Sequence, residues 1–248
     1  MKAMIFAAGL GSRLKPLTDT KPKALIEVAG KPMLEHVILK LKASGFDEIV
    51  INVHHFANQI LDFLKANDNF GVNIYISDET EELLDTGGGL KKAGKYFMPP
   101  LHEDKEGILL HNVDILSNCD LQDLIRFHQQ NPDVYAMLVS RRITSRYLLF
   151  DDNNLLCGWI NKNTGQVKPA GLEYKKGKYQ EYAYSGIQAI NPLLLNKGMR
   201  PGKYSIIDFY LQVCRNVKIQ CYPADNLQLI DIGKPETLIK AEEFLNHL

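Results

Sequence analysis

The first 140 residues alternate between strand-like and helix-like segments, and this alternation restricts the fold more than any other feature. Apolar strand patterns cover residues 2–8, 48–53, 72–77, 107–111 and 135–140. Helical patterns lie between them, at residues 31–44, 57–66, 89–96 and 121–130. Because parallel strands need a crossover between them, we expect an α/β fold with a mixed, mostly parallel sheet covered by helices on both faces.

The pattern changes after residue 145. Short strand-like pieces at residues 147–150, 155–160 and 182–190 are separated by Gly, Asn and Lys turns, which predicts a small antiparallel insertion. Two helices, near residues 206–214 and 235–246, and strands near residues 218–222 and 228–231 complete the chain. No linker divides it, so we expect one domain over residues 1–248, with halves at 1–145 and 146–248.

Composition narrows the class of protein. Of the 248 residues, 45% are hydrophobic and 23% are charged, which is typical of a soluble globular chain. Lys plus Arg and Asp plus Glu both number 29, so the basic excess of a nucleic-acid binder is missing. The four cysteines form no CxxC, no apolar run reaches a membrane span of roughly 18–20 residues, and the N-terminus lacks a signal-peptide pattern. We expect a cytoplasmic protein with no membrane or nucleic-acid partner.

A glycine-rich loop follows the first strand, in the stretch FAAGLGSRLKPLTDTKPKAL. Gly9 and Gly11 allow backbone N–H groups to approach an anion, and Arg13 and Lys23 add positive charge. Residues 13–31 hold five basic and two acidic side chains in a chain with no net charge, which favours a phosphate site over a plain glycine turn. Leu14 stands where G-x-G-x-x-G needs its third glycine, and no P-loop motif is present, so neither of those phosphate-binding motifs applies.

Two aspartates lie at strand ends. Asp114 follows an apolar strand in HNVDIL, and Asp231 ends another in LQLIDIGKPETL. Phosphoryl chemistry on a triphosphate usually uses Mg²⁺, which one or two carboxylates can hold. Taken alone, each aspartate is equally well explained as a cap on a turn or helix.

The segments AAGLGSRLKPLTDTKPKAL and VAGKPMLEH resemble the signature of the sugar-1-phosphate nucleotidyltransferases. The resemblance extends along essentially the whole chain and implies a Rossmann-like fold, a nucleoside triphosphate and a sugar 1-phosphate as substrates, and Mg²⁺ as cofactor. It implies that residues 1–145 bind the nucleotide and that residues 146–248 contribute the sugar site and part of the metal site. It implies that Gly9, Gly11 and Arg13 bind the triphosphate and that Lys23 reaches the reacting phosphates. It also implies that Ala7 and Ala8 lie beside the base and that Asp114 and Asp231 hold the metal.

The segment LLDTGGGLKKA (residues 83–93) has three glycines before the short helix expected from residue 89. In the family this region borders the nucleobase, which makes Thr86, Gly87 and Gly88 candidates for that contact. Asp85 departs from the small residue that many members have. This variant is most similar to the branch that includes N-acetylmuramate-1-phosphate uridylyltransferases and relatives of mannose-1-phosphate guanylyltransferases.

Two later segments resemble the family's sugar-binding motifs. LLCGWINKNTGQ aligns with a strand that ends in E-K-P; Lys162 keeps the lysine expected at the sugar phosphate, and Asn161 replaces the glutamate. In YAYSGIQAI, Ser185 and Gly186 fit the sugar-facing motif and Tyr184 replaces an asparagine. Asn112, beside the first aspartate, completes the candidate sugar residues.

The resemblance implies nucleotidyl transfer, giving a nucleoside diphosphate sugar and pyrophosphate. Arg13 is expected to stabilise the leaving pyrophosphate, Lys23 the developing charge, and Lys162 the sugar phosphate. We expect UTP with N-acetylmuramate 1-phosphate first, and GTP with mannose or heptose 1-phosphate second. The replacements at Asn161 and Tyr184 keep a different class open, a nucleotide-sugar sensor or regulatory subunit, and we expect a monomer or weak homodimer.

Overall fold

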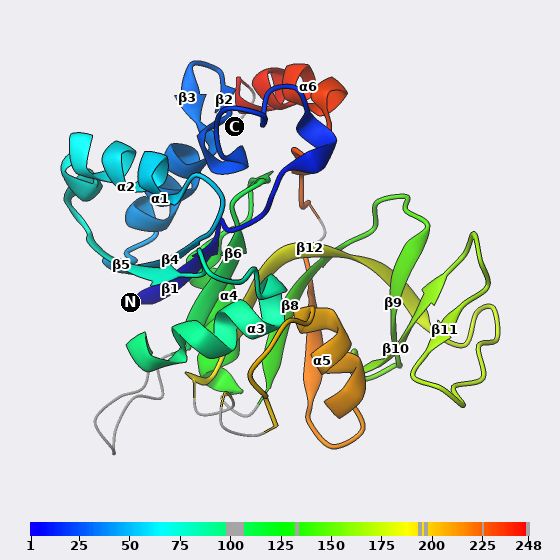
Figure 1. Ribbon diagram of the computed structural model, residues 1–248. Coiled ribbons are helices and arrows are strands. Elements are labelled where there is room, and N and C mark those ends of the chain that lie inside the picture. Colours follow the sequence, from blue (N-terminus) through cyan, green and yellow to red (C-terminus); the bar gives the residue numbers. More distant parts are fainter. Residues whose placement is uncertain (98–106, 132–133, 193–194, 196–197, 225, 247–248) are drawn as a thin grey trace.

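The computed structural model describes the chain except residues 98–106, 132–133, 193–194, 196–197, 225 and 247–248 (Figure 1). At its centre is a ten-stranded sheet in which β1 (Lys2–Phe6) pairs in parallel with β4 (Glu48–Val53) and β6 (Ile108–Asn112). The parallel strand β5 (Asn73–Asp78) extends the sheet beyond β4. The other strands of this sheet are β8 (Tyr135–Ser140), β9 (Arg146–Phe150), β10 (Leu156–Asn161), β11 (Val167–Lys168), β12 (Gln180–Ile190) and β13 (Ile219–Pro223).

The long strand β12 joins the two parts of the sheet. It is antiparallel to β6, β8 and β9, and β10 and β11 continue from β9 as an antiparallel insertion at one side of the molecule (Figure 1). The predicted α/β fold, a mixed sheet with a small antiparallel region, is confirmed.

Helices bury both faces of the sheet. One hydrophobic core packs under α1 (Met33–Ala43), α2 (Ala57–Ala66) and α4 (Leu121–Gln130), and a second packs under α3 (Asp85–Ala93) and α5 (Ile206–Val213). Strand β1 supplies both cores by alternation, with Ala3 and Ile5 in the first and Met4 and Phe6 in the second. This double burial fixes the carboxyl end of β1, where the glycine-rich loop begins.

A third core brings the end of the chain back to that loop. Helix α6 (Pro235–Leu245) contributes Ala241 to a cluster that also holds Leu14, Leu116 and Ile232. Two small antiparallel sheets border the cluster, β2 (Glu27–Val28) with β3 (Lys31–Pro32) and β7 (Ile115–Ser117) with β14 (Leu229–Asp231).

The prediction that three glycines precede a helix starting at residue 89 is wrong. Helix α3 begins at Asp85, and Gly87, Gly88 and Gly89 are buried inside it. The physical reason is close packing, because a Cβ on Gly88 would lie 2.0 Å from the carbonyl oxygen of Gly202. In the part of the chain that the structure describes, no helix has the length and apolar character needed to span a bilayer.

Candidate functional site

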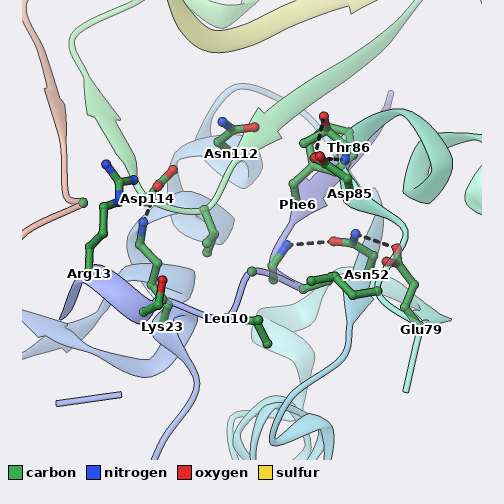
Figure 2. A pocket seen from close by; sticks show the side chains of 18 of the residues that line it. Phe6, Leu10, Arg13, Lys23, Asn52, Glu79, Asp85, Thr86, Asn112 and Asp114 are labelled. Atoms are coloured by element: carbon green, nitrogen blue, oxygen red, sulfur yellow. Dashed lines mark hydrogen bonds and ion pairs between the residues drawn. The ribbon is translucent and has the colours of Figure 1, made fainter. Parts of the chain in front are cut away.

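A cavity of about 490 Å³ opens beyond the carboxyl ends of β1, β4 and β6. This is where open α/β sheets bind ligands. Figure 2 shows two groups of polar side chains around it: Arg13, Lys23 and Asp114 at one end, and Asn52 and Glu79 with their neighbours at the other.

The glycine-rich loop forms one wall. Ala7, Ala8, Gly9, Gly11 and Arg13 all line the cavity, so the structure brings these predicted residues together. Gly11 has a left-handed φ of +64°, and a Cβ there would lie 2.8 Å from Thr18 Cγ2. Only glycine satisfies both constraints without strain.

Lys23 and Asp114 form an ion pair at the cationic end of the cavity, with their side chains 10% and 19% exposed. Lys23 begins a short 3-10 turn, Lys23–Leu25, and Asp114 lies in the turn between β6 and β7. Lys23, predicted for the reacting phosphates, and Asp114, predicted for the metal, therefore meet, although 91 positions separate them in the sequence.

Asp231 is held beside Asp114 by the backbone. Strand β14 pairs Asp231 with Ile115, and the N–H of Ile232 donates to the carbonyl oxygen of Asp114 at 2.8 Å. Burial, followed by the charge of Asp114, raises the pKa of the Asp231 carboxyl. Its Oδ1 is buried and has no hydrogen-bond partner among the described residues.

The aspartate pair fits a hard divalent cation. Two adjacent carboxylates, one with an unsatisfied buried oxygen, offer the oxygen ligands that Mg²⁺ prefers. Gly233 leaves room beside them, since a Cβ at that position would lie 3.0 Å from both Arg13 Nη2 and Asp231 Oδ1. Among the described residues there is no group of three or more His, Cys, Asp or Glu that could hold a metal.

A buried hydrogen-bond chain forms the floor of the opposite end. The N–H of Ala7 donates to Asn52 Oδ1 at 2.7 Å, and Asn52 Nδ2 donates to Glu79 Oε1 at 2.8 Å. The N–H of Leu84 donates to Glu79 Oε2 at 3.0 Å, so both carboxylate oxygens are used. Burial raises the pKa of Glu79, whose side chain is fully enclosed.

The predicted base-side residues separate into two groups. Thr86 lines the cavity together with Asp85, whose Oδ1 accepts from the N–H of Thr86 at 2.6 Å. Gly87 and Gly88 are not among the described residues that line it, because they face the segment at residues 202–204.

Of the predicted sugar-side residues, Asn112 lines the cavity and Gly186 packs against the side chain of Asn112. A Cβ on Gly186, which has a φ of +78°, would be 2.9 Å from Asn112 Nδ2. Tyr184 is half-buried, and burial followed by the charge of Asp114 raises its pKa. The hydroxyl of Ser185 donates instead to the carbonyl oxygen of Leu138 and is fully buried.

Asn161 and Lys162 are not among the described residues that line the cavity. Lys162 Nζ pairs with Glu181 Oε1 at 2.6 Å and also bonds to the hydroxyl of Tyr174. The Oδ1 of Asn161 accepts from the N–H of Asn163 at 3.0 Å, which closes the turn after β10.

The lining residues that sequence reasoning missed include Asn52, Glu79, Lys203 and Gly233. Asn52 is a polar residue inside an apolar strand, and Glu79 follows the strand at residues 73–78 directly, so both carried a signal. Lys203 carried none, because a long-range contact brings its segment to the site.

Comparison with known proteins identifies the family. Residues 2–155, more than half of the chain, match the family model described as "Nucleotidyl transferase". The chain belongs to this family, and the resemblance predicted from the sequence is confirmed.

Individual relatives add detail. An N-acetylmuramate alpha-1-phosphate uridylyltransferase of Neisseria meningitidis serogroup B is 45% identical over 120 residues, which cover 48% of this chain and 49% of that protein. A mannose-1-phosphate guanyltransferase of Gibberella zeae is 37% identical over 142 residues, which cover 57% of this chain and 38% of that protein. The chain thus spans less than half the length of the N-acetylmuramate and glucose 1-phosphate uridylyltransferase relatives that it matches.

The fold is shared with solved structures. A UDP-glucose pyrophosphorylase complexed with UDP-glucose superposes with a TM-score of 0.76, covering 99% of this chain and 98% of that one. The sequence identity is 14%, so this likeness concerns the fold alone.

Proposed function

We propose that this protein transfers a nucleotidyl group from a nucleoside triphosphate to a sugar 1-phosphate, releasing pyrophosphate. The observation that carries the proposal is the arrangement of one cavity. A glycine-rich loop lines it, the Arg13, Lys23 and Asp114 cluster closes one end, and the Asn52–Glu79 floor closes the other.

The chemistry requires positioning and charge neutralisation rather than a protein nucleophile. A sugar phosphate oxygen attacks the α-phosphorus, and the bond from that phosphorus to the pyrophosphate oxygen breaks. The sugar phosphate is already an anion, so no general base has to remove a proton. The nucleophile therefore needs only to be oriented in line with the leaving group.

The loop and its cations serve the triphosphate. Backbone N–H groups at Gly9 and Gly11 would approach the phosphate oxygens, and Ala7 and Ala8 would border the nucleoside. Arg13 would stabilise the leaving pyrophosphate, and Lys23 would neutralise charge on the reacting phosphates. Because Lys23 is paired with Asp114, a bound phosphate must compete with that carboxylate for the ammonium.

Asp114 and Asp231 are the proposed Mg²⁺ ligands. The buried Oδ1 of Asp231 without a partner in the described part of the chain supports this assignment. When bound, Mg²⁺ would supply positive charge that offsets the phosphate negative charge.

For the nucleotide and sugar we propose UTP and N-acetylmuramate 1-phosphate. The uridylyltransferase relative supports this choice. A second cavity of about 310 Å³ also supports it, since Arg141 and Arg142 line it and Arg142 Nη2 donates to the carbonyl oxygen of Tyr184, a predicted sugar-side residue, at 3.4 Å. N-acetylmuramate carries a carboxylate that mannose lacks, and an exposed arginine is a suitable partner for it.

The other sugar-side residues have separate proposed roles. Asn112 would contact the sugar from the lining of the cavity, Tyr184 and Gly186 would contact it from β12, and Ser185 would contribute through its backbone. Lys162 would have to leave Glu181 to reach the sugar phosphate, and Asn161 would shape the turn beside it. These roles, like a monomeric or weakly dimeric state, remain predictions.

Two other functions are kept as outcomes of the test. GTP with mannose or heptose 1-phosphate is supported by the guanyltransferase relative. A nucleotide-sugar sensor is supported by the ion pair of Lys162 with Glu181, since Lys162 is not among the described residues that line the cavity.

The experiment is pyrophosphate release with Mg²⁺, in which four nucleoside triphosphates are crossed with five sugar 1-phosphates. The sugars are N-acetylmuramate, N-acetylglucosamine, glucose, mannose and heptose 1-phosphates. Release that needs UTP and N-acetylmuramate 1-phosphate is expected. Release only with GTP and mannose or heptose 1-phosphate would replace the substrates, and nucleotide binding without release for any pair would favour the sensor.

A further inference from the structure

Residues 202–204 dock across the N-terminal turn of α3 through backbone hydrogen bonds. The N–H of Gly87 donates to the carbonyl oxygen of Tyr204 at 2.9 Å, and the N–H of Tyr204 donates to that of Leu84 at 3.2 Å. The first residue of α5 extends the contact, because the N–H of Ile206 donates to Thr86 Oγ1 at 2.9 Å. These bonds fix the segment against the helix that borders the cavity.

The glycines of α3 make this approach possible. A Cβ on Gly88 would lie 2.0 Å from the carbonyl oxygen of Gly202, and a Cβ on Gly87 would lie 2.4 Å from Tyr204 Cε2. Gly202 itself has a φ of +108°, a conformation that L side chains rarely adopt. The glycine triplet therefore accommodates a crossing segment, and any larger residue at position 88 would displace it.

Docking brings Lys203 to the cavity. Lys203 lies between Gly202 and Tyr204 and lines the cavity together with Asp85 and Thr86, at the end away from the Lys23–Asp114 pair. Its side chain is in no ion pair among the described residues.

Several other polar atoms at this end already take part in hydrogen bonds. Both carboxylate oxygens of Glu79 accept hydrogen bonds, and Asp85 Oδ1 accepts from Thr86. Thr86 Oγ1 in turn accepts from the N–H of Ile206. Lys203 is thus a charged donor in no ion pair among the described residues, and it lines the region where the proposed function puts the nucleobase.

We infer that Lys203 selects uracil and guanine through the carbonyl oxygen that they carry in place of the amino group of cytosine and adenine. The inference rests on the proposed nucleotidyl transfer. An ammonium group has three donors and no acceptor. Uracil and guanine offer a carbonyl oxygen where cytosine and adenine carry an amino group. A base amino group facing the Lys203 ammonium would place two hydrogen-bond donors against each other, with no acceptor between them. A site built to hydrogen-bond a particular substrate group rejects analogues that lack that group.

The test compares Lys203→Met with the wild type for UTP, GTP, CTP and ATP. Nucleotide affinity is measured by calorimetric titration without sugar phosphate, and kcat/KM by pyrophosphate release. We expect the variant to lose about 10- to 100-fold in affinity for UTP and GTP, as for a lost charged hydrogen bond, and to keep its affinity for CTP and ATP. Lys95→Met is the matched control, because Lys95 is exposed on the short turn after α3 and does not line the cavity.

Two results would overturn the inference. An equal loss for all four nucleotides would place the Lys203 contact on ribose or phosphate, and unchanged affinities would remove Lys203 from nucleotide recognition. Because binding is measured without turnover, failure of nucleotidyl transfer would leave this readout intact. Conversely, active transfer with an unchanged base preference would overturn the role of Lys203 and keep the proposed function.

Discussion

Gly9 and Gly11 lie in the same loop, but only Gly11 combines a left-handed φ with close neighbours. Replacing each glycine with alanine therefore tests separately what the loop contributes to stability and to activity. At Gly11, alanine must adopt a φ of +64°, which costs roughly 1–2 kcal/mol. Its Cβ would lie 2.8 Å from Thr18 Cγ2 and 3.0 Å from Lys23 Cβ, and such overpacking costs about 1–3 kcal/mol. Alanine also leaves the unfolded chain fewer conformations than glycine does. This effect stabilises the folded state by about 0.4–1 kcal/mol and offsets part of the loss.

Gly11→Ala is therefore expected to lose about 2–4 kcal/mol of stability. For a chain of this size, that loss lowers Tm by about 5–15 °C in thermal unfolding followed by circular dichroism. Gly9→Ala is the matched control, because its Cβ meets nothing within 4 Å and its φ is ordinary.

Gly9→Ala should keep the wild-type Tm within about 2 °C. Its new methyl group would nevertheless stand in the cavity where phosphates approach, so turnover should fall about 10- to 100-fold. A Gly11→Ala variant with the wild-type Tm, or a Gly9→Ala variant that loses as much stability, would refute this reasoning.

Four further predictions concern the rest of the site. Asp114→Asn and Asp231→Asn should each lower the rate of pyrophosphate release by about 100-fold or more while the protein remains folded by circular dichroism; full activity would remove that residue from the metal site. Without divalent cations, Asp231→Asn should raise Tm at pH 7, because burial and the charge of Asp114 raise the pKa of Asp231 and penalise its ionised form in the folded state. This penalty is absent below the unfolded-state pKa of about 3.9 and grows as pH rises through the raised pKa, so a Tm difference that persists at pH 3 would contradict it. Arg142→Met should lower kcat/KM for N-acetylmuramate 1-phosphate about tenfold or more and leave kcat/KM for N-acetylglucosamine 1-phosphate unchanged. Equal losses for the two sugars would contradict a contact between Arg142 and the N-acetylmuramate carboxylate. Gly88→Ala should lower Tm and weaken base preference, because its Cβ would clash with the Gly202 carbonyl at 2.0 Å. A folded variant with an unchanged base preference would show that this packing does not affect base recognition.

Local patterns predicted much of the architecture. The spacing of Leu34, Val37, Ile38 and Leu41 predicted α1, and these four residues are buried in one core. The glycine-rich loop was also predictable, because its residues are adjacent in sequence and follow a strand whose carboxyl end faces the ligand site in such sheets.

Contacts between distant segments were harder to predict. The pairing of β7 with β14, which holds Asp231 beside Asp114, involves two strands of three residues each that periodicity cannot reveal. The sequence pattern predicts that the glycines of α3 precede a helix, whereas they lie inside it. Their packing partner, at residues 202–204, lies more than 110 positions later in the sequence.

Side-chain direction limited the remaining predictions. Ser185 fitted a sugar-facing motif, yet its hydroxyl bonds to the backbone of Leu138 on the neighbouring strand β8. Lys162 fitted a phosphate-binding motif, but Glu181 on β12 binds its ammonium. Both outcomes depend on strand register, which the motif alone does not specify.

The central claim is that the cavity directs attack at the α-phosphorus of a nucleoside triphosphate. The most direct measurement follows radioactive phosphate from UTP labelled at either the α or the γ position, with N-acetylmuramate 1-phosphate and Mg²⁺. The account predicts that the α label enters the sugar nucleotide and that the γ label leaves as pyrophosphate. Release of the γ label as inorganic phosphate, with none of the α label joined to sugar, would contradict it.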